Sequence, residues 1–243
     1  MNLFVMIFAA TLAVVLVAYL LVKYLPLKLR WLVSLLLLVL AAFLGYKIYV
    51  GIMAPIKFNK EKKVRFAKVI KNLKIIRDAE VAHFQVTGRY TRNKEGLIQF
   101  IDTAKFALTR TYTEVKTVDT GGGITKDIEV RIIDTTGYEP VIKKFKNRDY
   151  KNMFKVPGVV GKEFSLDTGM TEKVVGLKVP TFEAKTDKES VLIGMNKDLI
   201  RVEKEDIRTD HVKGEFISVG SLEEVTTGGN WPPSYDKDDK KDK

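Results

Sequence analysis

The chain has 243 residues, and its 41 lysines and arginines against 30 aspartates and glutamates give a net charge of +11. Cysteine is absent, which excludes a disulfide scaffold and zinc sites built on cysteine. Hydrophobic residues make up 46% of the chain but are concentrated in its first 54 positions, which excludes a simple soluble enzyme and a disordered protein. Two apolar segments are too few to enclose the substrate path of a polytopic transporter.

Two apolar segments near the start of the chain predict membrane-spanning helices. The first, residues 3–22, contains no charged residue, and the second, residues 31–53, contains only Lys47. Each is long enough to cross a bilayer, which takes about 20 apolar residues. No basic segment precedes the first one and no cleavage site follows it, so a signal peptide is not expected. The sequence therefore predicts a transmembrane hairpin over residues 1–56, with a polar turn at Pro26.

A basic helix is predicted after this hairpin, over residues 59–86, with a break at Pro55 and an N-cap at Asn59. Its apolar residues recur at helical spacing, and lysines and arginines lie between them. We expect this basic, amphipathic segment, residues 57–88, to contact anionic lipid headgroups. The alternative is a solvated basic face. The candidate headgroup ligands are Lys60, Lys62, Lys63, Arg65, Lys68, Lys71 and Lys74.

The positive charge is confined to this membrane end. Residues 1–77 contain 13 basic residues and one acid, a net charge of +12, whereas the remaining 166 residues contain 28 basic and 29 acidic residues. A nucleic-acid-binding protein would be expected to carry its basic patch on the folded domain. The sequence therefore predicts a lipid bilayer with anionic headgroups as a partner, and no nucleic acid.

The charges that flank the two apolar segments make opposite predictions about the side of the membrane on which the C-terminal domain lies. The first apolar segment has basic residues only after it, which favours a C-terminal domain outside the cytoplasm. The dense basic run after the second apolar segment favours a cytoplasmic domain. The residues alone leave both orientations open.

The corner after the basic helix resembles known families. Gly88 is predicted to end the long helix, and Asn93 to cap a short one. Residues 76–101 resemble the corresponding segment of the major pseudopilins of type II secretion systems and of type IV pilins. The matching positions are Ala79, Phe84, Gly88, Tyr90, Thr91, Gly96, Leu97 and Phe100. The resemblance implies an anchored helix that leads into a β-sheet. Because the prepilin-peptidase site is absent and two spans are predicted, pilin-like processing is not expected.

A second resemblance concerns the whole layout. The IMAPIKFNKEK segment at residues 52–62 and the VGSLEE and GNW motifs at residues 219–224 and 229–231 are similar to those of uncharacterised, membrane-anchored envelope proteins of Bacteroidota-type bacteria. This resemblance implies a chain in the bacterial cytoplasmic (inner) membrane whose soluble domain lies in the periplasm. A cytoplasmic domain is the alternative, and the resemblance implies no activity.

The rest of the chain predicts a mainly antiparallel β domain, residues 89–235, packed by a short helix from Asn93 to about Ala107. A hairpin is predicted from residues 112–118 and 127–133, with its turn at the Gly121-Gly122-Gly123 run. Further strands are predicted at residues 164–166, 174–178, 182–184, 190–195, 199–203 and 212–219, with a short helix near 141–146. Residues 236–243 are predicted to be a disordered tail. The expected fold class is therefore α+β, with two transmembrane helices and a long basic helix before the β domain.

Few residues indicate catalytic chemistry. His83 and His211 are the only histidines, and both are expected in packing or surface positions. The chain has no Gly-x-Ser-x-Gly nucleophile motif and no phosphate-binding loop. Glu203, Glu205 and Asp206 have an alternation of oxygens that suits a cation, but they lack the spacing of a known calcium loop, so solvated acids are the alternative. No cofactor and no catalytic residue is predicted.

Asn230 and Trp231 stand in a constrained Gly-Gly-Asn-Trp-Pro-Pro loop at residues 228–233. Trp231 is a candidate contact for a partner protein, and the alternative is that it covers one end of the core. The sequence favours a non-enzymatic, membrane-anchored structural or assembly component of a secretion- or pilus-like envelope complex, with other membrane or envelope proteins as partners. The alternatives are an envelope hydrolase with an unrecognised active site and a cytoplasmic-facing regulatory subunit.

Overall fold

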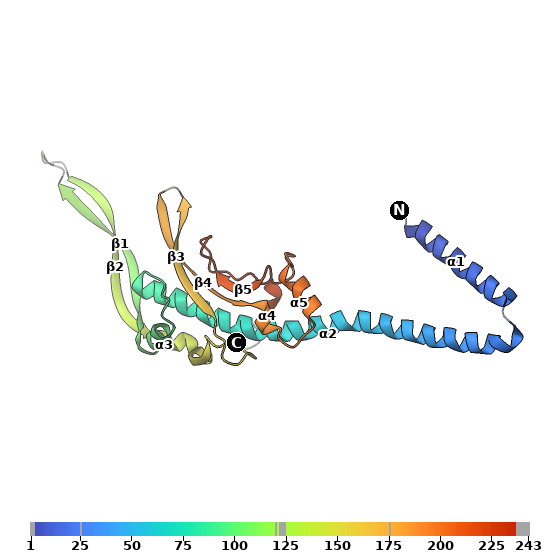
Figure 1. The fold of residues 1–243 in the computed structure, drawn as a ribbon. Coiled ribbons are helices and arrows are strands. Elements are labelled where there is room, and N and C mark those ends of the chain that lie inside the picture. The colour runs from blue at the N-terminus through green and yellow to red at the C-terminus, as the bar shows by residue number, and fades with distance from the viewer. Residues whose placement is uncertain (1–2, 25, 120, 122–124, 175, 237–243) are drawn as a thin grey trace. The chain divides into compact units, whose positions relative to one another are not determined.

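The computed structural model describes residues 3–24, 26–119, 121, 125–174 and 176–236, and it divides the chain into two compact units, Met1–Lys57 and Phe58–Lys243. The fold is α+β with antiparallel sheets, as the sequence predicts (Figure 1). Most of the Gly121-Gly122-Gly123 turn, and the predicted tail from residue 237 onward, lie outside the described residues.

The first unit is helical. It contains α1 (Leu3–Tyr24) and the first part of α2 (Leu27–Thr87), and the Pro26 carbonyl at their junction accepts a hydrogen bond from the Leu29 amide at 2.9 Å. Within the described residues, one helix is long and apolar enough to cross a membrane, the part of α2 from Leu29 to Thr87. The apolar stretch described in α1 is shorter, Thr11–Leu20.

The predicted break between the second apolar segment and the basic helix is wrong, because α2 contains both. Pro55 lies inside α2, and Asn59 therefore caps no helix. A proline inside a helix removes only one backbone donor, here the one that would reach the carbonyl of Gly51. The residues on both sides of Pro55 are helical, and the helix continues as far as Thr87.

The second unit is built around the remainder of α2. Its fully buried side chains include Phe66, Ile70, Leu73 and Ile76, which belong to the hydrophobic core. The helix ends at Thr87, and Gly88 follows with φ +75°, a left-handed conformation that favours glycine. The predicted helix end at Gly88 is thus confirmed.

The short packing helix is also confirmed, as α3 (Lys94–Thr103), but it ends about four residues before the predicted end at Ala107, because β1 begins at Lys105. The Asn93 side chain accepts a hydrogen bond from the Gly96 amide at 3.0 Å, which satisfies one of the free donors in the first turn. Leu97 and Ile101 lie one turn apart on its buried face. After α3 the chain enters the sheets.

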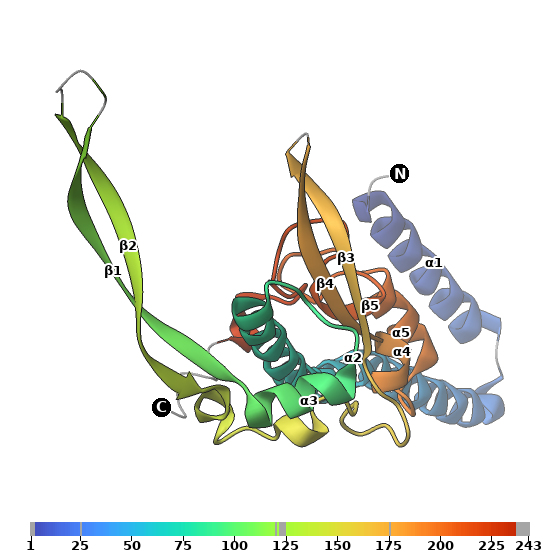
Figure 2. The same cartoon turned by 90° about the vertical axis from the view of Figure 1, so that its left-hand side faces the viewer.

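Two separate antiparallel sheets follow. The first contains only β1 (Lys105–Asp119) and β2 (Thr125–Pro140), and the second contains β3 (Ser165–Val174), β4 (Leu177–Asp187) and β5 (Phe216–Gly220) in the order β3-β4-β5. Figure 2 shows β1 and β2 as a twisted ribbon apart from the other sheet. The predicted hairpin is confirmed and is longer than expected.

Several predicted strands are wrong. Residues 190–195 and 199–203 lie in and around α4 (Lys188–Val191) and α5 (Lys197–Lys204) instead. Asp187 and Asn196 cap these helices: the Asp187 side chain accepts a hydrogen bond from the Ser190 amide, and the Asn196 side chain accepts from the Asp198 and Leu199 amides. Such caps favour a helix even where the apolar run suggests a strand.

Other predicted elements shift or shorten. The predicted strand at 174–178 is not one strand, because residue 174 ends β3 and residues 177 and 178 begin β4. Of the predicted last strand, 212–219, only residues 216–219 belong to β5. The predicted short helix near residue 141 is a 3-10 helix, η1 (Val141–Phe145), and two further 3-10 helices are η2 (Tyr150–Asn152) and η3 (Pro233–Tyr235).

Candidate functional site

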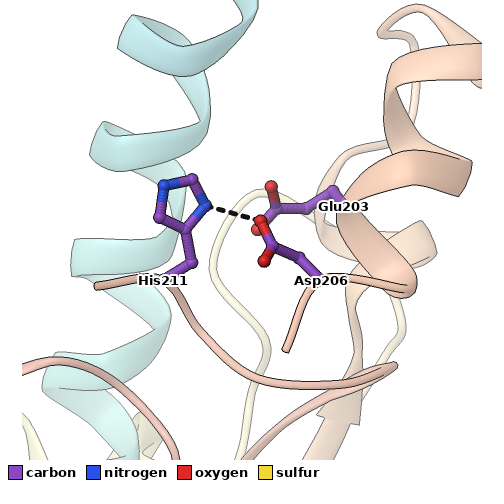
Figure 3. Close-up of side chains that lie close together, drawn as sticks. All are labelled: Glu203, Asp206 and His211. Carbon is purple, nitrogen blue, oxygen red and sulfur yellow. Dashed lines mark ion pairs between the residues drawn. The ribbon is translucent and has the colours of Figure 1, made fainter. Parts of the chain in front are cut away.

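The densest group of chemically active side chains is formed by Glu203, Asp206 and His211, in the last turn of α5 and the loop that follows it (Figure 3). One ligand atom from each residue lies within 4.8 Å of the others. Ile200 and Glu203 share the buried face of α5, because residues three apart in a helix lie on the same side. This helix therefore carries the Glu203 carboxylate inward.

Glu203 is held by two lysines from other elements. Lys62 of α2 donates a hydrogen bond to Glu203 Oε2 at 2.6 Å, and both side chains are buried. Lys188 of α4 lies 3.5 Å from Glu203 Oε1. The carboxylate thus joins α4 and α5, which are neighbours in the sequence, to α2, which lies much earlier in the chain.

Lys188 is fully buried, with 0% of its surface exposed. Its ammonium donates to the backbone carbonyl of Glu203 at 2.6 Å and to that of Val212 at 2.7 Å. Burial lowers the pKa of Lys188 below its ordinary value, and the nearby Glu203 carboxylate partly offsets this effect. With these acceptors around it, Lys188 is satisfied by hydrogen bonds as a buried charge must be.

Asp206 is held by the loop itself. Arg208 donates from Nε at 3.0 Å to Asp206 Oδ1 and from a terminal nitrogen at 2.6 Å to Oδ2, a bidentate pair. His211 Nδ1 lies 2.8 Å from Asp206 Oδ2. The Arg208 hydrogen bonds hold the pKa of Asp206 well below its ordinary value, so this carboxyl is ionised at neutral pH.

The charge balance of the cluster argues against a resident cation. Two carboxylates and an imidazole are a donor set that suits a divalent metal ion. Here, however, Lys62, Lys188 and Arg208 supply three positive charges against the two negative charges of Glu203 and Asp206. A cation would have to displace these partners. The geometry therefore fits a network of ion pairs that fastens α2, α4 and α5 together.

A cavity of about 330 Å³ opens beside this cluster. Glu203 and His211 line it, together with Ser234 of η3 and with Lys62 and Lys63 of α2. Of the predicted cation ligands, Glu203 and Asp206 are in the cluster and Glu205 is exposed and takes no part in it. Within the described residues, His83 lies apart from the cluster: its Nδ1 is 2.7 Å from the Arg89 carbonyl oxygen.

The seven predicted headgroup ligands fall into two groups. Lys62 and Lys74 are buried, Lys62 against Glu203 and Lys74 against Asp236, whose carboxylate is 3.0 Å away. Arg65 is half-buried and donates to the backbone carbonyls of α4 and its C-terminal turn. These three side chains contact groups within the domain and are therefore not available to bind lipid headgroups. The exposed members are Lys60, Lys63, Lys68 and Lys71.

Asn230 and Trp231 occupy structural positions. Trp231 is buried in the core cluster, and its indole nitrogen lies 3.3 Å from Asp236 Oδ1. The Asn230 amide donates to the carbonyls of Lys213 and Phe216, both at 2.8 Å, and its oxygen accepts from the Ser218 amide at 3.0 Å. The side chain of Asn230 therefore cross-links the start of β5 to the loop after it.

Two residues of the site, Lys188 and Arg208, are not among the candidates that the sequence indicates. The only sequence signal for Arg208 is its spacing of two residues from Asp206. Comparisons with protein-family models, with curated proteins and with solved structures find no match for this chain.

Proposed function

We propose that this chain is a non-enzymatic, membrane-anchored structural or assembly component of a multi-protein envelope complex, of the secretion or pilus type. One observation carries the proposal: helix α2 contains both an apolar segment long enough to cross a membrane and the central core helix of the second unit. An anchor that is also the core helix of a domain suits a protein whose task is to hold that domain at a membrane.

The ion-pair cluster supports the same proposal. The Glu203 carboxylate is neutralised by Lys62 and Lys188 and fastens α5 to α2 and α4, while Asp206 is paired with Arg208 within the loop that follows α5. Removing one partner from a buried pair leaves an uncompensated charge. Such a network therefore favours the one arrangement of helices in which every charge is paired. A scaffold needs this property, whereas a general acid or base needs a carboxyl free to exchange a proton.

We further propose that the anchor is a hairpin of two spans, residues 3–22 and 31–53, in the bacterial inner membrane, with the domain in the periplasm. The helix-to-sheet corner that resembles pseudopilins, at residues 76–101, is consistent with this arrangement. The test uses Val160→Cys, because Val160 is a fully exposed loop residue and the chain has no other cysteine. An impermeant thiol reagent should label the variant in intact cells with a permeabilised outer membrane. Labelling only after lysis would indicate a cytoplasmic domain.

Lipid contact is proposed for the exposed lysines of α2. Each basic residue near an anionic surface contributes about 1 kcal/mol. A chain that starts at Lys57 should bind phosphatidylglycerol vesicles at low salt and be released at high salt. Replacing Lys60, Lys63, Lys68 and Lys71 by glutamine should abolish this binding. The Arg110→Gln variant, which changes one exposed charge of β1, is the control and should bind as the parent does.

The assembly role is tested by the mass of the protein in its native membrane. After extraction in a mild detergent, the full chain should migrate with other envelope proteins, far above the 27.5 kDa of one copy. It should also stay in the membrane pellet after carbonate washing. A chain that carbonate extracts, or that is a lone protomer in every mild detergent, would contradict the proposal.

An envelope hydrolase is the second candidate, because the Asp206–His211 pair lies beside a cavity that Ser234 also lines. A serine hydrolase uses an acid to orient a histidine, and Ser234 would be the candidate nucleophile here. A fluorophosphonate probe should label the protein if this candidate is correct, and Ser234→Ala should abolish labelling. The assembly proposal expects no labelling of the parent chain.

A further inference from the structure

The β1–β2 hairpin is unpartnered in this chain. The two strands form a sheet of their own, and no described residue between positions 107 and 139 belongs to the buried core. The outer edge of each strand therefore carries backbone donors and acceptors with no neighbouring strand among the described residues. A two-stranded ribbon is only marginally stable by itself, and a long free edge is a template for another strand.

The side chains of β2 form a pattern that can pair with a second copy of itself. Because side chains alternate along a strand, Lys126, Ile128, Val130, Ile132 and Asp134 share one face. This series is symmetric about Val130: isoleucines flank it on both sides, and a lysine at one end matches an aspartate at the other. Such a series can pair with itself in antiparallel orientation.

The opposite face of β2 fits the same register. Glu129 and Arg131 are its central charges, and their neighbours across the hairpin are Val115 and Thr113, which carry no charge. Neither side chain forms an ion pair with another residue in the part of the chain that the structure describes. Antiparallel pairing about Val130 would place each Glu129 opposite an Arg131 of the second strand, with no like charges opposite one another.

We propose that two copies of this chain pair through the edge of β2, antiparallel and with the two-fold axis at Val130. The product is a four-stranded sheet in the order β1-β2-β2-β1. Ile128 of one protomer lies opposite Ile132 of its partner, and Lys126 lies opposite Asp134. A two-fold interface of this kind is closed, so it gives a dimer and not a fibre. The proposal needs only the hairpin and does not depend on the proposed function.

Single cysteines in the full chain test the register, because the chain contains no cysteine of its own. Directly opposed Cα atoms in an antiparallel pair are about 4.5 to 5.5 Å apart, within disulfide reach. Val130→Cys should therefore form a disulfide-linked dimer under mild oxidation. Lys116→Cys, on the same face of β1, is the matched control and should stay monomeric.

An experiment that combines two different cysteine variants distinguishes the proposed register from registers shifted along the strand. In this register the two copies of residue 128 lie about 14 Å apart, at 3.4 Å per residue, and so do the two copies of residue 132. Ile128→Cys and Ile132→Cys should each fail to cross-link alone. Co-expressed with different tags, they should cross-link to one another.

Charge exchange provides the second measurement. Arg131→Glu would place glutamates opposite one another at both central pairs, and dimerisation in detergent should weaken at least about tenfold. Glu129→Arg should do the same, and the double variant should restore the parental affinity. Because these charges have no ion pair within the described chain, the fold of each protomer should not change, as circular dichroism can verify.

Two results would overturn the proposal. One is a Val130→Cys chain that stays monomeric while it remains folded. The other is a cross-link that forms equally at Lys116→Cys, which would indicate pairing through β1 or collision without register. Failure of these tests would leave the anchoring proposal intact, because the carbonate and labelling experiments do not involve the hairpin.

Discussion

Glu80 should make the domain less stable as the pH rises, and Glu80→Gln should remove this dependence. The side chain lies on α2, 0% exposed, and its only hydrogen-bond partner among the described residues is the Thr91 amide, 3.1 Å from Oε2. Oε1 is buried without a partner in the described part of the chain. Burial raises the pKa of Glu80 from 4.5 to about 8, while the Thr91 hydrogen bond opposes the shift.

The sign and size follow from proton linkage. Between pH 4.5 and about 8 the folded chain keeps the Glu80 proton that the unfolded chain has lost, so folding binds a proton and stability falls as the pH rises. At 1.36 kcal/mol per pH unit, the free energy of unfolding should drop by about 5 kcal/mol across this range. Below pH 4.5 both states are protonated, and the Glu80 contribution does not change.

The assay is urea unfolding followed by Trp231 fluorescence in a Trp31→Phe background, since these are the only two tryptophans and Trp231 is buried in the core. The difference in unfolding free energy between Glu80→Gln and its parent should grow by about 5 kcal/mol from pH 4.5 to pH 8. A difference that stays constant over this range would show that Glu80 titrates normally in the folded chain, and would refute the reasoning.

Three further predictions concern the packing of the second unit. Gly220→Ala should destabilise it by about 3 kcal/mol in the same assay, because the new Cβ would lie 2.2 Å from the Phe182 carbonyl oxygen at φ +74°. The control Gly214→Ala, at φ +72° but with nothing within 4 Å, should cost about 1 kcal/mol, and equal effects would contradict the close approach. Glu203→Gln should cost about 3 kcal/mol or more, since Lys62 and Lys188 lose their countercharge, and an unchanged stability would exclude a structural network. Calcium, zinc or EDTA should leave the unfolding midpoint unchanged, whereas stabilisation by a metal would show that the cluster binds one.

The sequence predicts the local elements of this chain well where a residue type has one clear conformational use. Gly88 ends α2 and Asn93 begins α3 as expected, because a left-handed residue and an N-cap are local requirements. The α4–α5 region is different. The strands predicted there, 190–195 and 199–203, are only six and five residues long, a length at which helix and strand patterns are hard to distinguish.

The candidate site was less predictable because its partners are distant. The sequence places Glu203 in an acidic group, but its partner Lys62 is 141 positions earlier, and Lys188 approaches from a third helix. No local spacing indicates such pairs. The sequence presented Lys62 as one of several similar lysines on a basic helix, and only tertiary packing separates it from the others.

The burial of Lys62 and Lys74 reduces the number of positive charges on α2 that can attract anionic lipid. Lys60 and Lys62 are two residues apart, which turns their side chains by about 200° around the helix, so one is exposed and the other is buried against Glu203. Lys63, Lys68 and Lys71 are exposed as Lys60 is. The charge of the buried lysines is compensated inside the domain and adds little to any surface potential. A contribution from α2 to lipid attraction must therefore come from the exposed lysines, which is why the vesicle experiment removes those four.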